Sequence, residues 1–340
     1  MKVAVTGSSG LIGTALTAGL RADGHQVVRL VRRPPRGGSA GGESTAPDEI
    51  RWDPRAADAG SPPLSGFDAL VHLAGAPVGA HRWTASYKTE IRASRVLPTR
   101  ALASVLAASV LPPKVFVVAS AIGWYGGTGR TPVIEDAPAG TGFLARVVAD
   151  WEAAAAPARD AGIRVVHLRS GLVLGMEGGV LPRLCLPARF GLLPRFGNGR
   201  QWMSWISLTD EIRAIRFLLE GPGAELTGPV NLTAPNPVTN SELTSALHHA
   251  LHRPDFPLLR VPAPVLSLGL GEMSSELLTS ARVLPKALHD AGYEFRYPTI
   301  GAALAGELGK PRAPVTRRET GRGLAAATGP FGIILMRLAA

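Results

Sequence analysis

The chain begins with a glycine-rich segment of the kind that binds phosphate groups through its backbone. The segment reads Gly7-Ser8-Ser9-Gly10-Leu11-Ile12-Gly13. It lies between an apolar run typical of a buried strand, residues 2–6, and a helical pattern over residues 11–22. Gly7 allows a tight turn, Gly10 lets a diphosphate approach the backbone, and Gly13 lets the helix pack closely on the strand. Free N–H groups at the start of the helix, together with the two serine hydroxyls, can donate to phosphate oxygens. We therefore predict a dinucleotide site, against the alternative of an ordinary strand, turn and helix.

The end of the second predicted strand indicates which dinucleotide binds. Proteins that bind NAD place a carboxylate about 20 residues after the glycine loop, where it holds the ribose hydroxyls. This chain has Val31-Arg32-Arg33 there and no carboxylate. A guanidinium can pair with a 2′-phosphate, so we predict NADP(H) rather than NAD(H). The alternative is that Arg32 and Arg33 only flank a surface loop.

Two further segments complete the predicted cofactor site. Asp53 follows a short strand candidate at residues 50–52, and its carboxylate could accept a hydrogen bond from the adenine amino group. The alternative for Asp53 is an ordinary turn residue. Leu73, Ala74 and Gly75 end an apolar strand beside the expected path of the cofactor, so we assign them to its binding site. His72 lies within that apolar run and is interpreted as a core residue.

Strand and helix patterns alternate over the first 170 residues, which favours an α/β fold. We predict a doubly wound parallel sheet of the Rossmann type with a smaller C-terminal domain on the substrate side. Strands are predicted over residues 2–6, 26–31, 50–52, 69–73, 114–119 and 164–168, and helices over 11–22, 84–108, 145–159, 210–220 and 243–251. The predicted domains are an NAD(P)-binding unit at 1–240, a small helical unit at 241–308 and a disordered basic tail at 309–340.

Composition bounds the class of protein. Of the 340 residues, 46% are hydrophobic and 18% charged, as in ordinary globular proteins. The single cysteine, Cys185, excludes an internal disulfide and suits a reducing compartment.

No secretory signal or membrane-length apolar run is evident, so we expect a soluble, cytoplasmic monomer or homodimer that contacts no membrane. The net charge of +10 suggests nucleic-acid binding, but much of the excess lies beyond Lys310 and the rest is scattered. We expect no nucleic-acid partner.

Several longer segments follow the glycine loop in order. They are Asp68 to Gly75, Arg82-Trp83-Thr84, Ser94-Arg95-Val96, Ser120 to Gly126, Asp150-Trp151-Glu152, Gly199 to Ile206, Ala234 to Asn240 and Arg282 to Lys286. With them the chain resembles the extended short-chain dehydrogenase/reductases of the NAD-dependent epimerase/dehydratase type, over roughly residues 1–308. More narrowly it resembles their YfcH-like atypical epimerase subgroup, which carries a C-terminal domain of unknown function. The resemblance implies a Rossmann core that binds a nicotinamide cofactor and a smaller part that covers the substrate.

The resemblance also exposes a departure at the usual catalytic positions. Ordinary members carry Tyr-x-x-x-Lys on the helix after the serine-bearing strand, where the lysine lowers the pKa of the tyrosine. If Glu152 is the acidic residue four positions after that lysine, then Leu144 and Val148 stand where tyrosine and lysine should be. Neither side chain can move a proton. Arg95 likewise replaces the asparagine usual in the preceding helix.

Two residues after the fifth predicted strand are candidates for chemistry. Ser120 follows a buried strand at the edge of the sheet where ligands bind, and could donate a hydrogen bond to a substrate carbonyl or hydroxyl. Its alternative is a turn-capping serine. Tyr125 is the phenol nearest in sequence and is the candidate proton donor, against a role in packing or positioning.

Substrate contacts are predicted from arginines and tryptophans. Arg95, Arg169 and Arg200 are candidate clamps for a carboxylate or phosphate, and the alternative for each is an ion pair within the protein. Trp202 is assigned to the substrate site, where its ring could stack on a ligand or simply fill the cleft. The eight histidines have no metal-ligand spacing, so we expect no metal.

These residues favour an NADP(H)-binding oxidoreductase or epimerase-like enzyme that acts on a small polar molecule. Hydride would pass between the nicotinamide and a carbon held near Ser120. The absent tyrosine–lysine pair supports a first alternative, a catalytically silent NADP(H)-binding sensor or scaffold. The basic charge supports a second, a protein associated with nucleic acid.

Overall fold

The computed structural model describes residues 1–33, 48–54 and 62–309. The predicted tail, apart from Gly309, lies outside the described residues. Among the described residues, seven parallel strands form the main sheet in the order β13-β7-β5-β4-β1-β2-β3. These are β1 (Lys2–Thr6), β2 (Gln26–Val31), β3 (Glu49–Arg51), β4 (Ala69–His72), β5 (Val115–Ala121), β7 (Arg164–Ser170) and β13 (Gly228–Leu232). The prediction of a doubly wound parallel sheet is confirmed.

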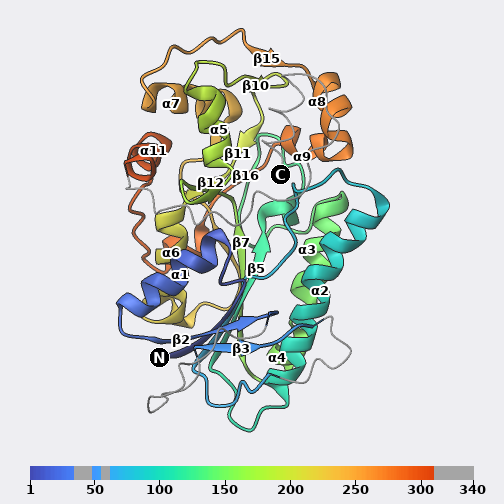
Figure 1. Cartoon of the computed structure of the whole chain (residues 1–340), viewed down its shortest axis with the longest axis vertical. Helices are drawn as coiled ribbons and strands as arrows, with labels where there is room; N and C mark the ends of the chain where they lie inside the picture. Colours follow the sequence, from blue (N-terminus) through green and yellow to red (C-terminus); the bar gives the residue numbers. More distant parts are fainter. Residues whose placement is uncertain (34–47, 55–61, 310–340) are drawn as a thin grey trace.

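Helices cover both faces of this sheet (Figure 1). Alternate residues of β1 point to opposite faces, so Val3 and Val5 pack toward one layer of helices while Ala4 packs toward the other. The first layer contains α1 (Leu11–Ala22), α6 (Leu208–Leu219) and α10 (Lys286–Asp290). The second contains α2 (Ala85–Ala107), α3 (Phe143–Ala153) and α4 (Ala156–Asp160). Because both faces are covered, the strands are almost continuously apolar.

Short elements beyond the carboxyl ends of the strands build a second apolar core. It includes Trp205, Leu247 and Leu270, all nearly or fully buried. Its helices are α5 (Leu181–Ala188), α7 (Asn240–Ala250), α8 (Ala263–Leu270), α9 (Ser274–Leu278) and α11 (Ile300–Leu308), with the 3-10 turn η3 (Gly271–Met273). The 3-10 turns η1 (Ile122–Tyr125), after β5, and η2 (Pro222–Glu225), between α6 and β13, lie outside this core. Its short strands are β8 (Leu172–Gly175), β9 (Gly178–Gly179), β10 (Arg195–Phe196), β11 (Trp202–Met203), β12 (Trp205–Ser207), β14 (Val238–Thr239) and β15 (Arg260–Val261). The paired strands β6 (Pro132–Val133) and β16 (Arg282–Val283) belong to a smaller apolar cluster with Tyr125.

One helix and one strand of the main sheet differ from the sequence-based expectation. The helix predicted over 145–159 is two helices, because α3 ends at Ala153 and α4 begins at Ala156. Pro157 explains the break, since its ring would clash with the Ala153 carbonyl in a continuous helix. Strand β13 was not predicted, because its Gly-Pro start is typical of a turn. Proline is tolerated there because β13 is an edge strand.

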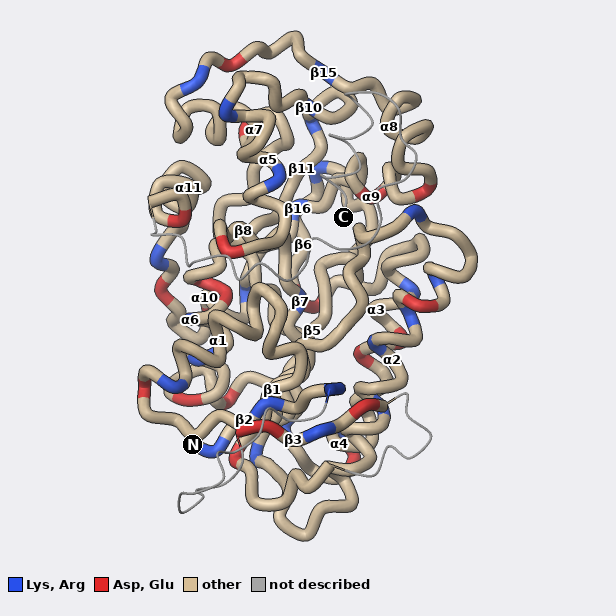
Figure 2. The backbone as a smooth tube through the Cα atoms, viewed as in Figure 1, with Lys and Arg blue, Asp and Glu red and all other residues tan. Residues whose placement is uncertain are grey.

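Two features of the described chain concern the expected absence of nucleic-acid and membrane partners. Blue and red residues are interspersed along the described chain, with no long basic run (Figure 2). No helix among the described residues has both the length and the apolar character needed to cross a lipid bilayer.

Glu211 is a fully buried carboxyl on α6 beneath the end of β7. Its Oε1 accepts a hydrogen bond of 2.6 Å from the Ser170 hydroxyl, and its Oε2 has no partner among the described residues. Burial raises the pKa of Glu211 from 4.5 to about 8. The carboxyl is therefore protonated at neutral pH.

Glu211 should make the protein less stable as the pH rises. The folded protein keeps a proton that the unfolded chain releases above pH 4.5. The stabilisation from this retained proton is therefore complete below pH 4.5 and is lost as the pH rises to about 8. Over this range the free energy of unfolding should fall by at most about 1.4 kcal/mol per pH unit. In Glu211→Gln this slope should disappear from thermal unfolding across that range, whereas the exposed Glu272→Gln should keep it. Equal slopes in Glu211→Gln and wild type would contradict the assignment.

Candidate functional site

The glycine loop brings α1 against the end of β1 at a distance that excludes side chains. Gly7 has φ +65°, and a Cβ there would lie 2.6 Å from the Leu73 carbonyl carbon. A Cβ at Gly13 would overlap the Gly7 carbonyl oxygen. The turn is closed by the Gly10 amide, which donates to the Gly7 carbonyl at 3.0 Å. Glycine at positions 7 and 13 is therefore a steric requirement of this turn.

The start of α1 presents donors for an anion. Its N-cap, Gly10, has no side-chain cap, so the first helical amides have no side-chain acceptor. These amides and the helix dipole favour a diphosphate at this point. Ser9 is exposed beside them, whereas Ser8 is buried and its Oγ accepts a hydrogen bond of 3.0 Å from Arg29 Nε. Such a cradle fits the diphosphate of a dinucleotide.

A buried polar contact holds β1 and β4 together below this loop. His72 is fully buried, as predicted, and its Nδ1 lies 2.6 Å from Thr6 Oγ1. The same hydroxyl accepts a hydrogen bond of 3.2 Å from the Leu73 amide. Burial lowers the pKa of His72 to about 4, so the imidazole is neutral. Together these contacts fix the position of the Leu73 backbone relative to the glycine loop.

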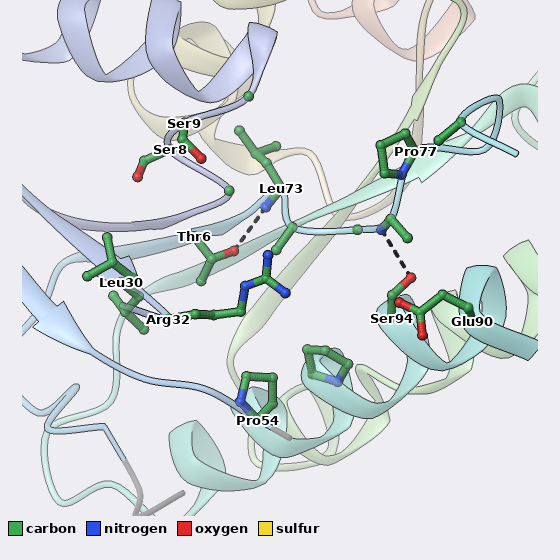
Figure 3. Close-up of a pocket in the computed structure, with 18 of the residues that line it drawn as sticks. Thr6, Ser8, Ser9, Leu30, Arg32, Pro54, Leu73, Pro77, Glu90 and Ser94 are labelled. Carbon is green, nitrogen blue, oxygen red and sulfur yellow. Dashed lines mark hydrogen bonds between the residues drawn. The ribbon is translucent and has the colours of Figure 1, made fainter. Parts of the chain in front are cut away.

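A cavity of about 1170 Å³ opens above these strand ends (Figure 3). Most residues of the predicted cofactor site line it, namely Gly7, Ser8, Ser9, Gly10, Arg32, Arg33, Leu73, Ala74 and Gly75. Leu11 and Ile12 instead pack into the core, and Gly13 is buried under the loop. Asp53 does not line the cavity, although its neighbours Trp52 and Pro54 do. The structure thus brings together three of the predicted cofactor segments.

The arginines near the end of β2 have different surroundings. Arg33 forms an ion pair of 2.6 Å with Glu49 of β3. Arg29, which sequence reasoning missed, contacts Ser8 and lies 3.4 Å from the same carboxylate. Arg32 is exposed, and its guanidinium points into the cavity (Figure 3). A lone charge inside the apolar strand 26–31 was the signal for Arg29.

Sequence reasoning also missed the face of α2 that lines the cavity. Tyr87, Glu90, Ser94 and Pro98 follow helical spacing, so they lie on one side of the helix and all line the cavity. The Ser94 hydroxyl accepts a hydrogen bond of 3.1 Å from the Ala76 amide, shown in Figure 3. This helix therefore forms the wall opposite the glycine loop.

The two residues predicted to do chemistry lie in a buried polar network. Ser120 donates a hydrogen bond of 2.6 Å to Glu152 Oε1. Tyr125 is 3% exposed; its hydroxyl donates to Asn231 Oδ1 at 2.7 Å and accepts from Arg169 Nη1 at 3.0 Å. Burial raises the pKa of Tyr125. Neither residue lines the cavity of Figure 3.

Arg169 is the centre of this network. Its guanidinium forms two hydrogen bonds with Glu152, at 2.9 Å and 3.0 Å, and lies 4.0 Å from the Trp124 ring centroid. The charge is paired within the protein, which is the alternative raised for this residue. Charge-paired and 2% exposed, Arg169 is not positioned to clamp a ligand.

At the positions where tyrosine and lysine are missing, the apolar side chains of Leu144 and Val148 pack against the chain. Both Leu144 and Val148 lie against Gly123 of η1, where a Cβ would be 3.4 Å and 3.7 Å from their side-chain atoms. No proton donor is therefore present at either position. Arg95, at the usual asparagine position, donates to the carbonyls of Ile91 and Ala76 at 2.9 Å and 3.0 Å. Burial lowers the pKa of Arg95 to about 10.

The remaining predicted substrate residues lie away from the cavity. Arg200 is exposed in the turn before β11. Trp202 is half-buried, and its ring centroid lies 4.6 Å from the guanidinium carbon of Arg282. Neither Arg200 nor Trp202 is among the residues that line the cavity of Figure 3.

A parallel sheet of this order, with a glycine loop between its first strand and helix and a cavity at its carboxyl edge, defines a dinucleotide-binding Rossmann protein. The model of the NAD dependent epimerase/dehydratase family matches residues 3–232, and that of a domain of unknown function, DUF1731, matches residues 261–306. The chain belongs to the NAD dependent epimerase/dehydratase family, which confirms the resemblance drawn from the sequence.

Similar proteins agree with this placement. The epimerase family protein ML0860 of Mycobacterium leprae is 44% identical over 310 residues, which are 91% of this chain and 96% of the relative. The crystal structure of human epimerase family protein SDR39U1 with NADPH has a TM-score of 0.80 and 33% identity, covering 90% of this chain and 99% of that one. A nucleoside-diphosphate sugar epimerase structure from Corynebacterium glutamicum has a TM-score of 0.72 and 39% identity, over 91% of this chain and 58% of that one.

The steric argument for the loop has a matched control on the same helix. Gly13→Ala should abolish dinucleotide binding and lower the melting temperature, because the methyl group would push α1 away from the Gly7 carbonyl. Gly19→Ala should bind normally and gain up to about 1 kcal/mol in helix propensity, because the nearest atom to its Cβ is 3.6 Å away. Isothermal titration and thermal unfolding measure both effects. Normal binding by Gly13→Ala would refute the cradle.

Proposed function

We propose that this chain binds NADP(H) and works as an oxidoreductase or epimerase-like enzyme on a small polar molecule. The observation that carries the cofactor preference is Arg32. Its guanidinium extends into the cavity, and among the described residues it has no hydrogen-bond or ion-pair partner. Neither Arg29 nor Arg33 offers this, because Glu49 lies beside both.

Residues of the chain are assigned to the diphosphate, the 2′-phosphate and the adenine of the cofactor. The α1 amides bind the diphosphate, Arg32 pairs with the 2′-phosphate, and Trp52 and Pro54 line the adenine end of the cavity. The positive charge of Arg29 beside Ser8 adds to the attraction for phosphate. The NADPH bound by human SDR39U1, a protein similar over 90% of this chain, supports the same cofactor here.

Bound NADP(H) would supply or accept a hydride, and a proton must move separately. The usual donor positions hold Leu144 and Val148, which cannot provide one. The Tyr125 proton is directed at Asn231, so that bond would have to break before Tyr125 could act as an acid. Titratable side chains that line the cavity include His81, Tyr87 and Glu90. The proton step is therefore assigned to the cavity wall or to water, and turnover should be slow.

The packing of Leu144 and Val148 against Gly123 also favours a second candidate, an NADP(H)-binding sensor or scaffold with no reaction of its own. The two candidates are separated by following NADPH absorbance with a broad panel of carbonyl compounds. Turnover of any member supports the enzyme. Saturable NADPH binding without turnover supports the sensor.

The charge of Arg32 should set the preference between the two nicotinamide dinucleotides. Arg32→Gln should raise the Kd for NADPH about 10- to 100-fold, since a charge-assisted pair with the 2′-phosphate is lost. The Kd for NADH should stay the same. Arg92→Gln removes an equal charge from a surface pair with Asp150 and should change neither Kd. Equal effects of Arg32→Gln on NADPH and NADH would contradict the assignment.

Tyr125→Phe separates a structural role from an acid role. The change removes two buried hydrogen bonds and leaves Asn231 Oδ1 without its donor, so unfolding should become easier by about 1–3 kcal/mol. The NADPH affinity and the rate with any substrate found in the panel should change little. A rate loss of about 100-fold with unchanged thermal unfolding would instead restore Tyr125 as the proton donor.

A further inference from the structure

A second unpaired guanidinium, that of Arg282, lies beside Trp202 near the carboxyl edge of the sheet. Trp202 opens β11 and Arg282 opens β16, and the guanidinium carbon of Arg282 lies 4.6 Å from the Trp202 ring centroid. Trp202 lies in the part of the chain that matches the epimerase/dehydratase family, and Arg282 in the part that matches the domain of unknown function. The pair therefore joins the two matched regions of the chain.

Hydrogen bonds place this pair just beyond strand β7. The Leu172 amide, two residues past the end of β7, donates to the Ser204 carbonyl at 2.9 Å. The Ser204 hydroxyl donates to the Ala281 carbonyl at 2.9 Å and accepts from the Val283 amide at 2.8 Å. Figure 1 shows β11 and β16 beyond the ends of β5 and β7. Ligands of open parallel sheets bind at this edge.

Hydrogen bonds hold in place the backbone segments that carry Trp202 and Arg282. The Trp202 amide donates to Ser280 Oγ at 3.0 Å, and the Ala281 amide donates to the Trp202 carbonyl at 3.2 Å. The Arg282 amide donates to Thr128 Oγ1 at 3.2 Å. These bonds fix the backbone at both residues, and the contact between the indole and the guanidinium orients the two side chains before any ligand arrives, which lowers the entropic cost of binding.

The guanidinium itself is unsatisfied. Among the described residues its side-chain nitrogens have no hydrogen-bond or ion-pair partner, and its Nε is buried. The two Nη groups are absent from the buried, unpartnered atoms of the described chain, so they reach solvent. Arg169 and Arg95 differ from Arg282 in this respect, because Arg169 is bonded to a carboxylate and Arg95 to backbone carbonyls. An unpaired fork of two donors matches a carboxylate or a phosphate.

We propose that Trp202 and Arg282 form an oxyanion subsite, in which the Nη groups of Arg282 bind a carboxylate or phosphate of a small molecule. Trp202 holds the guanidinium plane, and the domain of unknown function supplies the charged residue. That the bound anion is the substrate rests on the proposed function, whereas the binding itself needs no cofactor. The substrate class that follows is an anionic small molecule.

The test follows the indole N–H signals of protein labelled with 15N-tryptophan. The chain has six tryptophans, and Trp202→Phe assigns the signal of residue 202. Benzoate and phenyl phosphate serve as the oxyanion probes, and uncharged benzamide is the matched control ligand. We expect each oxyanion that binds to shift the Trp202 signal saturably, and benzamide to shift it far less. The response to the two oxyanions also tells a carboxylate site from a phosphate site.

Variants of Arg282 decide the role of the guanidinium. Arg282→Gln should weaken oxyanion binding about tenfold or more, and Arg282→Lys, which keeps the charge without the fork, should fall between. Arg213→Gln removes an equal charge from an exposed position of α6 and should bind as wild type does. Unchanged binding by Arg282→Gln, equal shifts by benzamide and benzoate, or no shift with either oxyanion would overturn the subsite. Because these titrations contain no cofactor, a failure of NADPH binding appears in a separate measurement.

Discussion

The close approach of α1 to β1 is the contact on which the rest of the site depends. It leaves no room for a Cβ at Gly13, and the Leu73 backbone after β4 leaves none at Gly7, so the backbone itself forms the surface that faces a ligand. The uncapped amides of α1 then point at the same space as the ends of β2 and β4. The contact between Thr6 of β1 and His72 of β4 positions the end of β4 beside the glycine loop. A cofactor cavity follows from backbone packing before any specific side chain acts.

Pairing of charges divides the arginines near the carboxyl edge into two kinds. Arg33 and Arg169 have carboxylate partners, and Arg95 is bonded to backbone carbonyls, so their charges are used within the fold. Arg32 and Arg282 have no hydrogen-bond or ion-pair partner among the described residues, and both present a guanidinium at the edge where ligands bind. A charge without a partner is costly to hold unless water or a ligand satisfies it. The proposals for a cofactor 2′-phosphate at Arg32 and for a substrate anion at Arg282 rest on these two unpaired guanidinium groups.

Local patterns predicted the parts of the fold that depend on neighbours in sequence. The strand, loop and helix around Gly7 to Gly13 have the bounds that apolar periodicity and glycine spacing indicated. Pairing between distant residues was beyond such patterns. Nothing in the sequence shows that Glu152 accepts hydrogen bonds from both Ser120 and Arg169, or that the Arg282 guanidinium lies against the Trp202 ring. Those contacts depend on the packing of elements far apart in the chain.

The central claim is that the α1 amides and the end of β2 bind the two phosphate regions of NADP(H). Hydrogen–deuterium exchange of the full chain with and without NADPH tests it most directly. Saturating NADPH should slow exchange in peptides that cover residues 7–14 and 29–33, and NADH at equal occupancy should protect the first but not the second. Saturable NADPH binding that leaves exchange at residues 7–14 unchanged would contradict the account.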